Sequence, residues 1–138
     1  MALAYLWRTE DVRLLGNYVF IPEGDSMPSL TGGFAFQSAF ENRIAPFVTA
    51  AKRFHVRGPT DDDAMAYEVY VGLSRRGNEE HVHGLTGLKI SPPAPVYFGF
   101  QHTGHDVNYY FGIALDFGSV SFWIADGKKP GIVVSFWR

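Results

Sequence analysis

Three pentapeptides decide how this chain folds: VYVGL (Val69–Leu73), VYFGF (Val96–Phe100) and YYFGI (Tyr109–Ile113). In each of them a tyrosine stands two positions before a glycine, and apolar residues fill the positions between and beside the pair. Successive side chains of a β-strand point to opposite faces. Each segment therefore predicts a strand with one Tyr/Gly face and one bulky apolar face.

The Tyr/Gly face has a structural explanation. A glycine inside a strand leaves the backbone uncovered unless a large neighbour lies over it. We therefore expect tyrosine rings to cover glycines of adjacent strands, an arrangement called aromatic rescue in protein design. The bulky faces are expected to form the hydrophobic core, and the Tyr/Gly faces a second, tiled surface.

Alternation with a period of two recurs along most of the chain, and no stretch of a dozen residues has a clear helical stripe. A helical interpretation of residues 36–47 is the main competitor, and Pro46 disfavours it. The segment EGDSMPSLTGG (23–33) is expected to be a long loop. Strands are expected at 34–40, 48–56, 67–74, 81–90, 96–101 and 107–117, followed by a hairpin.

These elements predict a single all-β domain spanning residues 1–138, an antiparallel β-sandwich or jelly-roll-like barrel of about eight to ten strands. In a sandwich, N-terminal strands carrying Trp7, Phe34, Phe36 and Phe40 would cover the Tyr/Gly face. In the alternative, part of that face stays open to a ligand or a partner chain.

The C-terminal hairpin has a predicted register. We expect Ile124 to lie opposite Ile132, because paired residues point to the same side of a sheet. This register gathers six apolar residues on one face, namely Val120, Phe122, Ile124, Ile132, Val134 and Phe136.

Composition limits the classes of function. Aromatic residues make up 16% of the 138 residues and charged residues only 19%, so ring surface beyond the needs of a core is expected at a ligand site or an interface. A net charge of −2 with scattered basic residues argues against a nucleic-acid partner. The apolar run before Arg8 is too short for a signal peptide or a membrane helix. We therefore expect a soluble protein with no membrane partner; the compartment stays open, with the cytoplasm favoured.

The first functional hypothesis is a non-enzymatic, lectin-like binding module that also self-associates as a homo-oligomer. Its flat rings would stack on a carbohydrate or another small molecule, and neighbouring amides would add hydrogen bonds. The same aromatic face would also suit a structural or assembly protein that buries it against its own copies. The predicted ligand-binding residues are Tyr70, Tyr97, Tyr110, Trp123, Trp137, Gln101 and Asn108.

The second hypothesis rests on histidines, since the chain has no cysteine and no nucleophile or phosphate-loop motif. His81 and His83 would share one face of a strand, while His102 and His105 lie in a later turn. An H-x-H strand with a later histidine resembles part of the cupin pattern, although Gly84 to Gly87 stand where its glutamate belongs. The first hypothesis needs no cofactor. The alternative is a cupin-like metalloenzyme with a divalent zinc, iron or copper ion.

Overall fold

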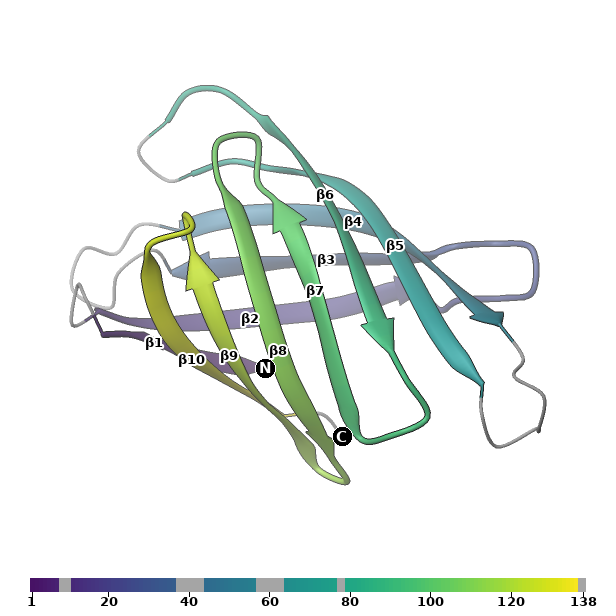
Figure 1. Ribbon diagram of the computed structural model, residues 1–138. Coiled ribbons are helices and arrows are strands. Elements are labelled where there is room, and N and C mark those ends of the chain that lie inside the picture. Colours follow the sequence, from purple (N-terminus) through teal and green to yellow (C-terminus); the bar gives the residue numbers. More distant parts are fainter. Residues whose placement is uncertain (8–10, 37–43, 57–63, 77–78, 137–138) are drawn as a thin grey trace.

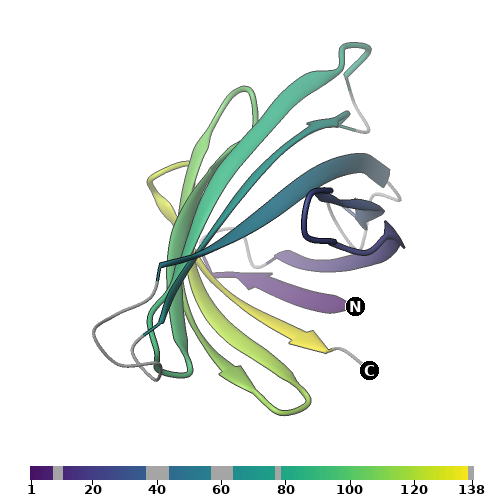
Figure 2. The same ribbon diagram turned by 90° about the vertical axis from the view of Figure 1, so that its right-hand side faces the viewer.

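Ten antiparallel strands in the computed structural model close into one barrel (Figures 1 and 2). The structure describes residues 1–7, 11–36, 44–56, 64–76 and 79–136. No helix occurs among them. The strands are β1 (Ala2–Leu6), β2 (Asp11–Ile21), β3 (Ser29–Phe36), β4 (Ile44–Val56), β5 (Met65–Ser74), β6 (His83–Ser91), β7 (Val96–His102), β8 (Val107–Leu115), β9 (Gly118–Ala125) and β10 (Lys129–Phe136).

Each strand pairs with the strand that follows it in the chain, and β1 pairs with β10 to close the ring. The all-β class, the number of strands and the barrel are thereby confirmed. The barrel is an up-and-down meander, so the N-terminal strands complete the wall and form no second sheet over the Tyr/Gly face. Closure removes the exposed strand edges that a sandwich would have to protect.

Strand β3 begins at Ser29, inside the segment that the sequence assigned to a loop. Thr31 and Gly33 face Thr49 and Phe47 of β4, so the prediction of a loop was wrong for residues 29–33. Residues that are typical of turns can form a strand here because the ring of Phe47 covers Gly33. The end of the predicted strand 34–40, including Phe40, falls outside the described residues.

The predicted cover by tyrosine rings is confirmed for two of the three pentapeptide glycines, Gly99 and Gly112, and is also found at Gly87, whereas Gly72 lies against Val48 and Thr49 of β4. Tyr70 lies opposite Gly87, Tyr110 opposite Gly99, and Tyr97 opposite Gly112. A Cβ atom added to any of these glycines would meet the ring of its cross-strand tyrosine. Each ring therefore occupies the volume that its glycine leaves free.

The orientation of the two faces is the reverse of the prediction. The Tyr/Gly face points into the barrel, and the bulky apolar face points out. Val71 is 53% exposed and Phe111 is 51% exposed, whereas Tyr110 is buried. A ring that lies across the glycine of the next strand takes up little height on the inner face. The larger side chains are left on the outside.

The hairpin of β9 and β10 places the six predicted apolar residues on one side, as expected, but its register differs by two residues. Phe122 lies opposite Ile132, and Ile124 lies opposite Pro130. The strands extend as far as Ala125 and Lys129, which leaves a turn of only three residues. Asp126 and Gly127 adopt positive φ angles of 54° and 60° in this turn, a conformation that Asp and Gly tolerate well.

Candidate functional site

Four of the seven predicted ligand-binding residues lie around one cavity in the barrel lumen: Tyr70, Tyr97, Tyr110 and Trp123. The rings of Tyr110 and Trp123 stack with centroids 4.7 Å apart. Polar groups of this cluster already have hydrogen-bond partners. The Tyr97 hydroxyl donates to Ser119 Oγ (3.0 Å), and the Trp123 indole donates to Ser121 Oγ (2.8 Å). The aromatic residues that the sequence placed on one face therefore do form a cluster, and this cluster lies in the barrel lumen.

A cavity of about 830 Å³ adjoins these rings and is lined by residues of several strands and of the β6–β7 turn. Lys89 extends its ammonium over the Tyr97 ring, 4.6 Å from the centroid. Arg53 also lines the cavity, and its guanidinium pairs with Glu68 at 2.8 Å. The lumen is thus a mixed aromatic and charged space near the barrel end that carries Met1 and Phe136.

Among the remaining predicted ligand-binding residues, Gln101 and Asn108 also point into the barrel but are not part of the lining of this cavity. Gln101 and Asn108 face each other across β7 and β8. The side-chain oxygen of Asn108 accepts a hydrogen bond from the Asp126 backbone (3.0 Å), which anchors the β9–β10 turn. Trp137 lies outside the described residues.

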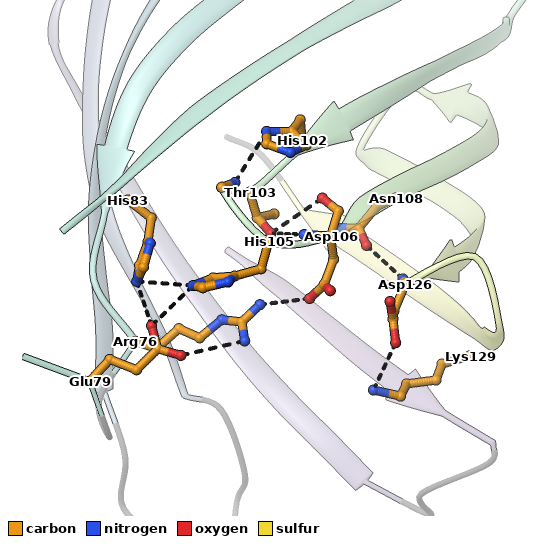
Figure 3. A network of polar contacts seen from close by, with 11 residues as sticks. Arg76, Glu79, His83, His102, Thr103, His105, Asp106, Asn108, Asp126 and Lys129 are labelled. Carbon is orange, nitrogen blue, oxygen red and sulfur yellow. Dashed lines mark hydrogen bonds and ion pairs between the residues drawn. The ribbon is translucent and has the colours of Figure 1, made fainter. Parts of the chain in front are cut away.

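At the opposite end of the barrel, Glu79, His83 and His105 form a cluster that we call the rim cluster (Figure 3). His83 Nε2 lies 2.5 Å from Glu79 Oε2 and 3.1 Å from His105 Nε2. His105 Nε2 lies 3.5 Å from the same Glu79 oxygen. Three atoms that are able to bind a metal therefore converge on one point, and this is the only such group among the residues that the structure describes.

Two neighbouring connections bring the rim cluster together. His83 begins β6, Glu79 lies in the β5–β6 connection, and His105 lies in the β7–β8 turn. The turn is held by a hydrogen bond from the Thr103 amide to the Asp106 carbonyl (3.0 Å). Gly104 has a φ of +86°, and a Cβ atom there would lie 2.7 Å from Cβ of His83. Glycine is therefore required at position 104 both for the turn and for the approach of the two histidines.

Arg76 supports the cluster from the side. It lies 3.6 Å from Glu79 Oε1 and 2.6 Å from Asp106 Oδ2, so it connects the two loops (Figure 3). Desolvation opposes ionisation of Glu79, but the hydrogen bond with His83 and the charge of Arg76 hold the pKa of Glu79 below its usual value. Asp106 has a lowered pKa for the corresponding reason: desolvation is outweighed by its hydrogen bond and ion pair with Arg76.

The predicted set of metal-binding residues is corrected in part. His83 and His105 come together as expected. His81 precedes β6 and shares no strand face with His83, and the ring of His102 accepts a hydrogen bond from the Gly104 amide of its own turn at 3.3 Å. Sequence reasoning missed Glu79, because a loop residue has no periodicity that would place it beside a histidine 26 positions later.

The outer wall is the third region of interest, and the sequence did not predict it. The outward positions of all ten strands are apolar almost throughout, and Lys52 is the only charged residue among those described. Its ammonium turns to the end of the barrel, where it donates to the Gly24 and Asp25 carbonyls. By contrast, Arg53, Glu68 and Lys89 all share the inward face with the tyrosines.

The amount of exposed surface agrees with this distribution. The chain has 9006 Å² of accessible surface, whereas a compact water-soluble protein of its mass, 15.4 kDa, would have about 7,200 Å². Within the described part of the chain, the buried hydrophobic residues are only Ala4, Leu6, Leu85 and Tyr110. Most large apolar side chains therefore contribute to the outer wall and not to a core.

Comparisons of the chain with protein-family models, with curated proteins and with solved structures give no match. In the part of the chain that the structure describes, no helix is long and apolar enough to cross a membrane.

Proposed function

We propose that this chain is a membrane-spanning β-barrel whose outer wall contacts lipid. The observation that carries the proposal is the reversal of the two faces: apolar side chains point out around the whole ring, and the charged side chains of the strands point in. Membrane barrels have this distribution, with an outward apolar band about 25 Å tall and a polar interior.

Strand length supports the proposal for part of the ring. A strand tilted by about 40° advances roughly 2.5 Å per residue along the barrel axis, so about ten residues cross the band. Strands β2, β4 and β5 contain 10 to 13 residues and reach this length, whereas the other seven strands contain 5 to 9. Closure matters as well, because an open strand edge would leave unpaired backbone groups in hydrocarbon.

Some outward aromatic residues lie toward the two ends of the wall, where membrane barrels carry aromatic belts, and others, such as Phe111 and Phe122, lie near its middle. Near one end are Tyr18, Phe20, Phe54, Tyr67 and Phe136; near the other are Trp7, Phe36 and Tyr109. Rings with one polar tip are favoured at the level of the lipid headgroups.

The expectation of a soluble protein rested on the absence of a long apolar run, a criterion that applies to helices and not to strands. Self-association explains the outer wall less well than lipid does. A typical dimer interface covers about 800 Å² per partner on one side of a molecule, whereas the apolar wall continues around all ten strands.

The test uses the position of the chain's tryptophans relative to lipid. Two single-tryptophan variants are made, one retaining Trp7 (Trp123→Phe with Trp137→Phe) and one retaining Trp123 (Trp7→Phe with Trp137→Phe). Each is folded into vesicles of phosphatidylcholine or of its brominated analogue, whose bromine quenches indole fluorescence on contact. Trp7 is outward and 47% exposed, so we expect strong quenching. Trp123 lies in the lumen and serves as the matched control, with little quenching expected.

Two results would overturn the proposal. One is a folded, monodisperse protein in detergent-free buffer that does not enter vesicles. The other is equal quenching of both tryptophans, which would mean that the wall does not separate lipid from the lumen.

We propose a second function for the lumen, in line with the binding hypothesis from the sequence. The cavity of about 830 Å³ is in the size range of small-molecule sites and offers aromatic rings together with Lys89 and Arg53. A carbohydrate or another small ring-containing molecule fits this chemistry. Titration of the Trp123-only variant with mono- and disaccharides should change its fluorescence, and no change with any sugar would count against a carbohydrate ligand.

A further inference from the structure

We propose that the rim cluster of Glu79, His83 and His105 binds one divalent transition-metal ion of the zinc type. The proposal concerns a barrel end and not the outer wall. It therefore stands or falls separately from the membrane proposal.

The arrangement of the three ligand atoms carries the inference. Zinc bonds of about 2.0 to 2.1 Å in a tetrahedron place neighbouring ligand atoms roughly 3.3 Å apart. The three separations in the rim cluster are 2.5, 3.1 and 3.5 Å. Movements of less than about 1 Å, all in loops or at the start of a strand, would give the triangle of a tetrahedral site.

The chemistry of the donors narrows the choice of ion. Two imidazole nitrogens and one carboxylate oxygen suit zinc, and also iron, copper or nickel, whereas calcium and magnesium prefer oxygen donors alone. Three protein ligands leave a fourth position for water or an external ligand, as in open zinc sites. His105 is 43% exposed and His83 is 18% exposed, so an ion has a path from solvent.

The surroundings hold the ligand atoms in place. Arg76 faces Oε1 of Glu79, which leaves Oε2 directed at the two histidines. Asp106 holds Arg76 from the adjacent loop, and Thr103 fixes the turn that presents His105. Metal sites commonly depend on such outer hydrogen-bond partners to orient their ligands.

The competing explanation is a hydrogen-bonded trio that binds no ion. Only one proton can lie between the two Nε2 atoms, and hydrogen bonds alone could hold such a trio together. The experiment must therefore measure the ion itself.

The protein is prepared without a histidine tag, stripped with a chelator and titrated with Zn²⁺ alone, followed by metal analysis after desalting. We expect one zinc per chain. His83→Ala, His105→Ala and Glu79→Gln should each weaken binding by more than about 100-fold, since removal of an outer partner alone costs 10- to 100-fold. His81→Ala and His102→Ala are matched controls from the same barrel end, and they should bind as the original chain does.

Titration with Co²⁺ gives an independent readout, because a tetrahedral site with nitrogen ligands develops strong visible absorption. Circular dichroism of each variant separates loss of the site from loss of the fold, and Glu79→Gln changes the shape of the cluster least. The proposal is overturned by absence of stoichiometric zinc in the folded chain. It is also overturned by zinc that persists in His83→Ala and His105→Ala, or that is lost in the two controls.

Discussion

Gly99 and Gly84 lie in adjacent strands with opposite surroundings, and they make a matched pair. A Cβ atom at Gly99 would contact the Leu88 carbonyl and lie 2.6 Å from the Tyr110 hydroxyl, whereas nothing lies within 4 Å of one at Gly84. Overpacking of this kind costs about 1 to 3 kcal/mol. We predict that Gly99→Ala lowers the free energy of unfolding by that amount.

Gly84→Ala is the control for this prediction and should be neutral or stabilise by up to about 1 kcal/mol, because alanine restricts the unfolded chain. Denaturant unfolding of both variants measures the difference. Equal effects would mean that the Tyr110 ring does not fill the space above Gly99.

We predict that the contact between Glu23, in the β2–β3 turn, and the Arg53 amide depends on pH. The Glu23 carboxylate accepts a hydrogen bond from the Arg53 amide at 2.8 Å, and that bond, aided by Lys52, holds the pKa of Glu23 below its usual value of 4.5. A lowered carboxyl pKa stabilises the folded state above the unfolded value. The stabilisation is lost as the pH falls through the folded value.

We therefore expect the Arg53 amide resonance to be constant near neutral pH and to shift in acid, with a midpoint below pH 4.5, as Glu23 is protonated. Nuclear magnetic resonance of the labelled protein provides the measurement. In Glu23→Gln the step should disappear from Arg53, while other carboxyl titrations remain. A step that survives in this variant would assign the contact to another group.

At the scale of the strand, an arginine introduced on the outer wall would distinguish a lipid environment from water. Val71 is 53% exposed near the middle of β5. In water, a charge at such a position usually changes stability by no more than about 0.5 kcal/mol. At the midplane of a bilayer, an arginine costs about 2 to 4 kcal/mol. We predict the larger loss for Val71→Arg when the chain is unfolded from vesicles.

Ser26→Arg, in the exposed β2–β3 turn, is the control and should leave stability nearly unchanged. A small effect at both positions would indicate that water, and not lipid, surrounds the outer wall.

The strands also show which parts of the fold could be predicted from the sequence alone. A period of two predicts which residues share a face, and for this reason the ring-over-glycine pairs and the six-residue face of the last hairpin were correct. The same period contains no information about which face points inward. A soluble protein was assumed, so the bulky face was placed inside.

One signal in the sequence opposed that assumption. Glu68 shares its parity with Tyr70, and Lys89 shares its parity with Gly87, so the charged residues belong to the Tyr/Gly face. The rim cluster had no such signal. Glu79 reaches the histidines through loop geometry, which spacing along the chain does not determine.

At the scale of the molecule, the seam between β1 and β10 decides whether the ring is closed. The first strand is short, with 5 residues, and its partner β10 is the last element of the described chain. Met1 and Phe136 meet at the end of the seam, where the terminal amine donates to the Phe136 carbonyl at 3.0 Å. An open sheet of the same ten strands would leave two long edges unpaired, which hydrocarbon does not tolerate.

A disulfide across the seam tests closure, since the chain has no cysteine of its own. Leu3 and Val134 are directly paired, and Cα atoms of paired residues fall within the 4.4 to 6.8 Å that a disulfide spans. We predict that Leu3→Cys with Val134→Cys forms an intramolecular bond under mild oxidation and migrates as a compact monomer in denaturing electrophoresis without reductant. Leu3→Cys with Val120→Cys is the control, because Val120 lies one strand farther on, roughly 10 Å from Leu3, and cannot be bridged. A bond between chains in the first variant, or equal crosslinking in both, would mean that β1 and β10 do not meet. The apolar wall would then be a curved sheet and not a ring, and lipid could not surround it on every side.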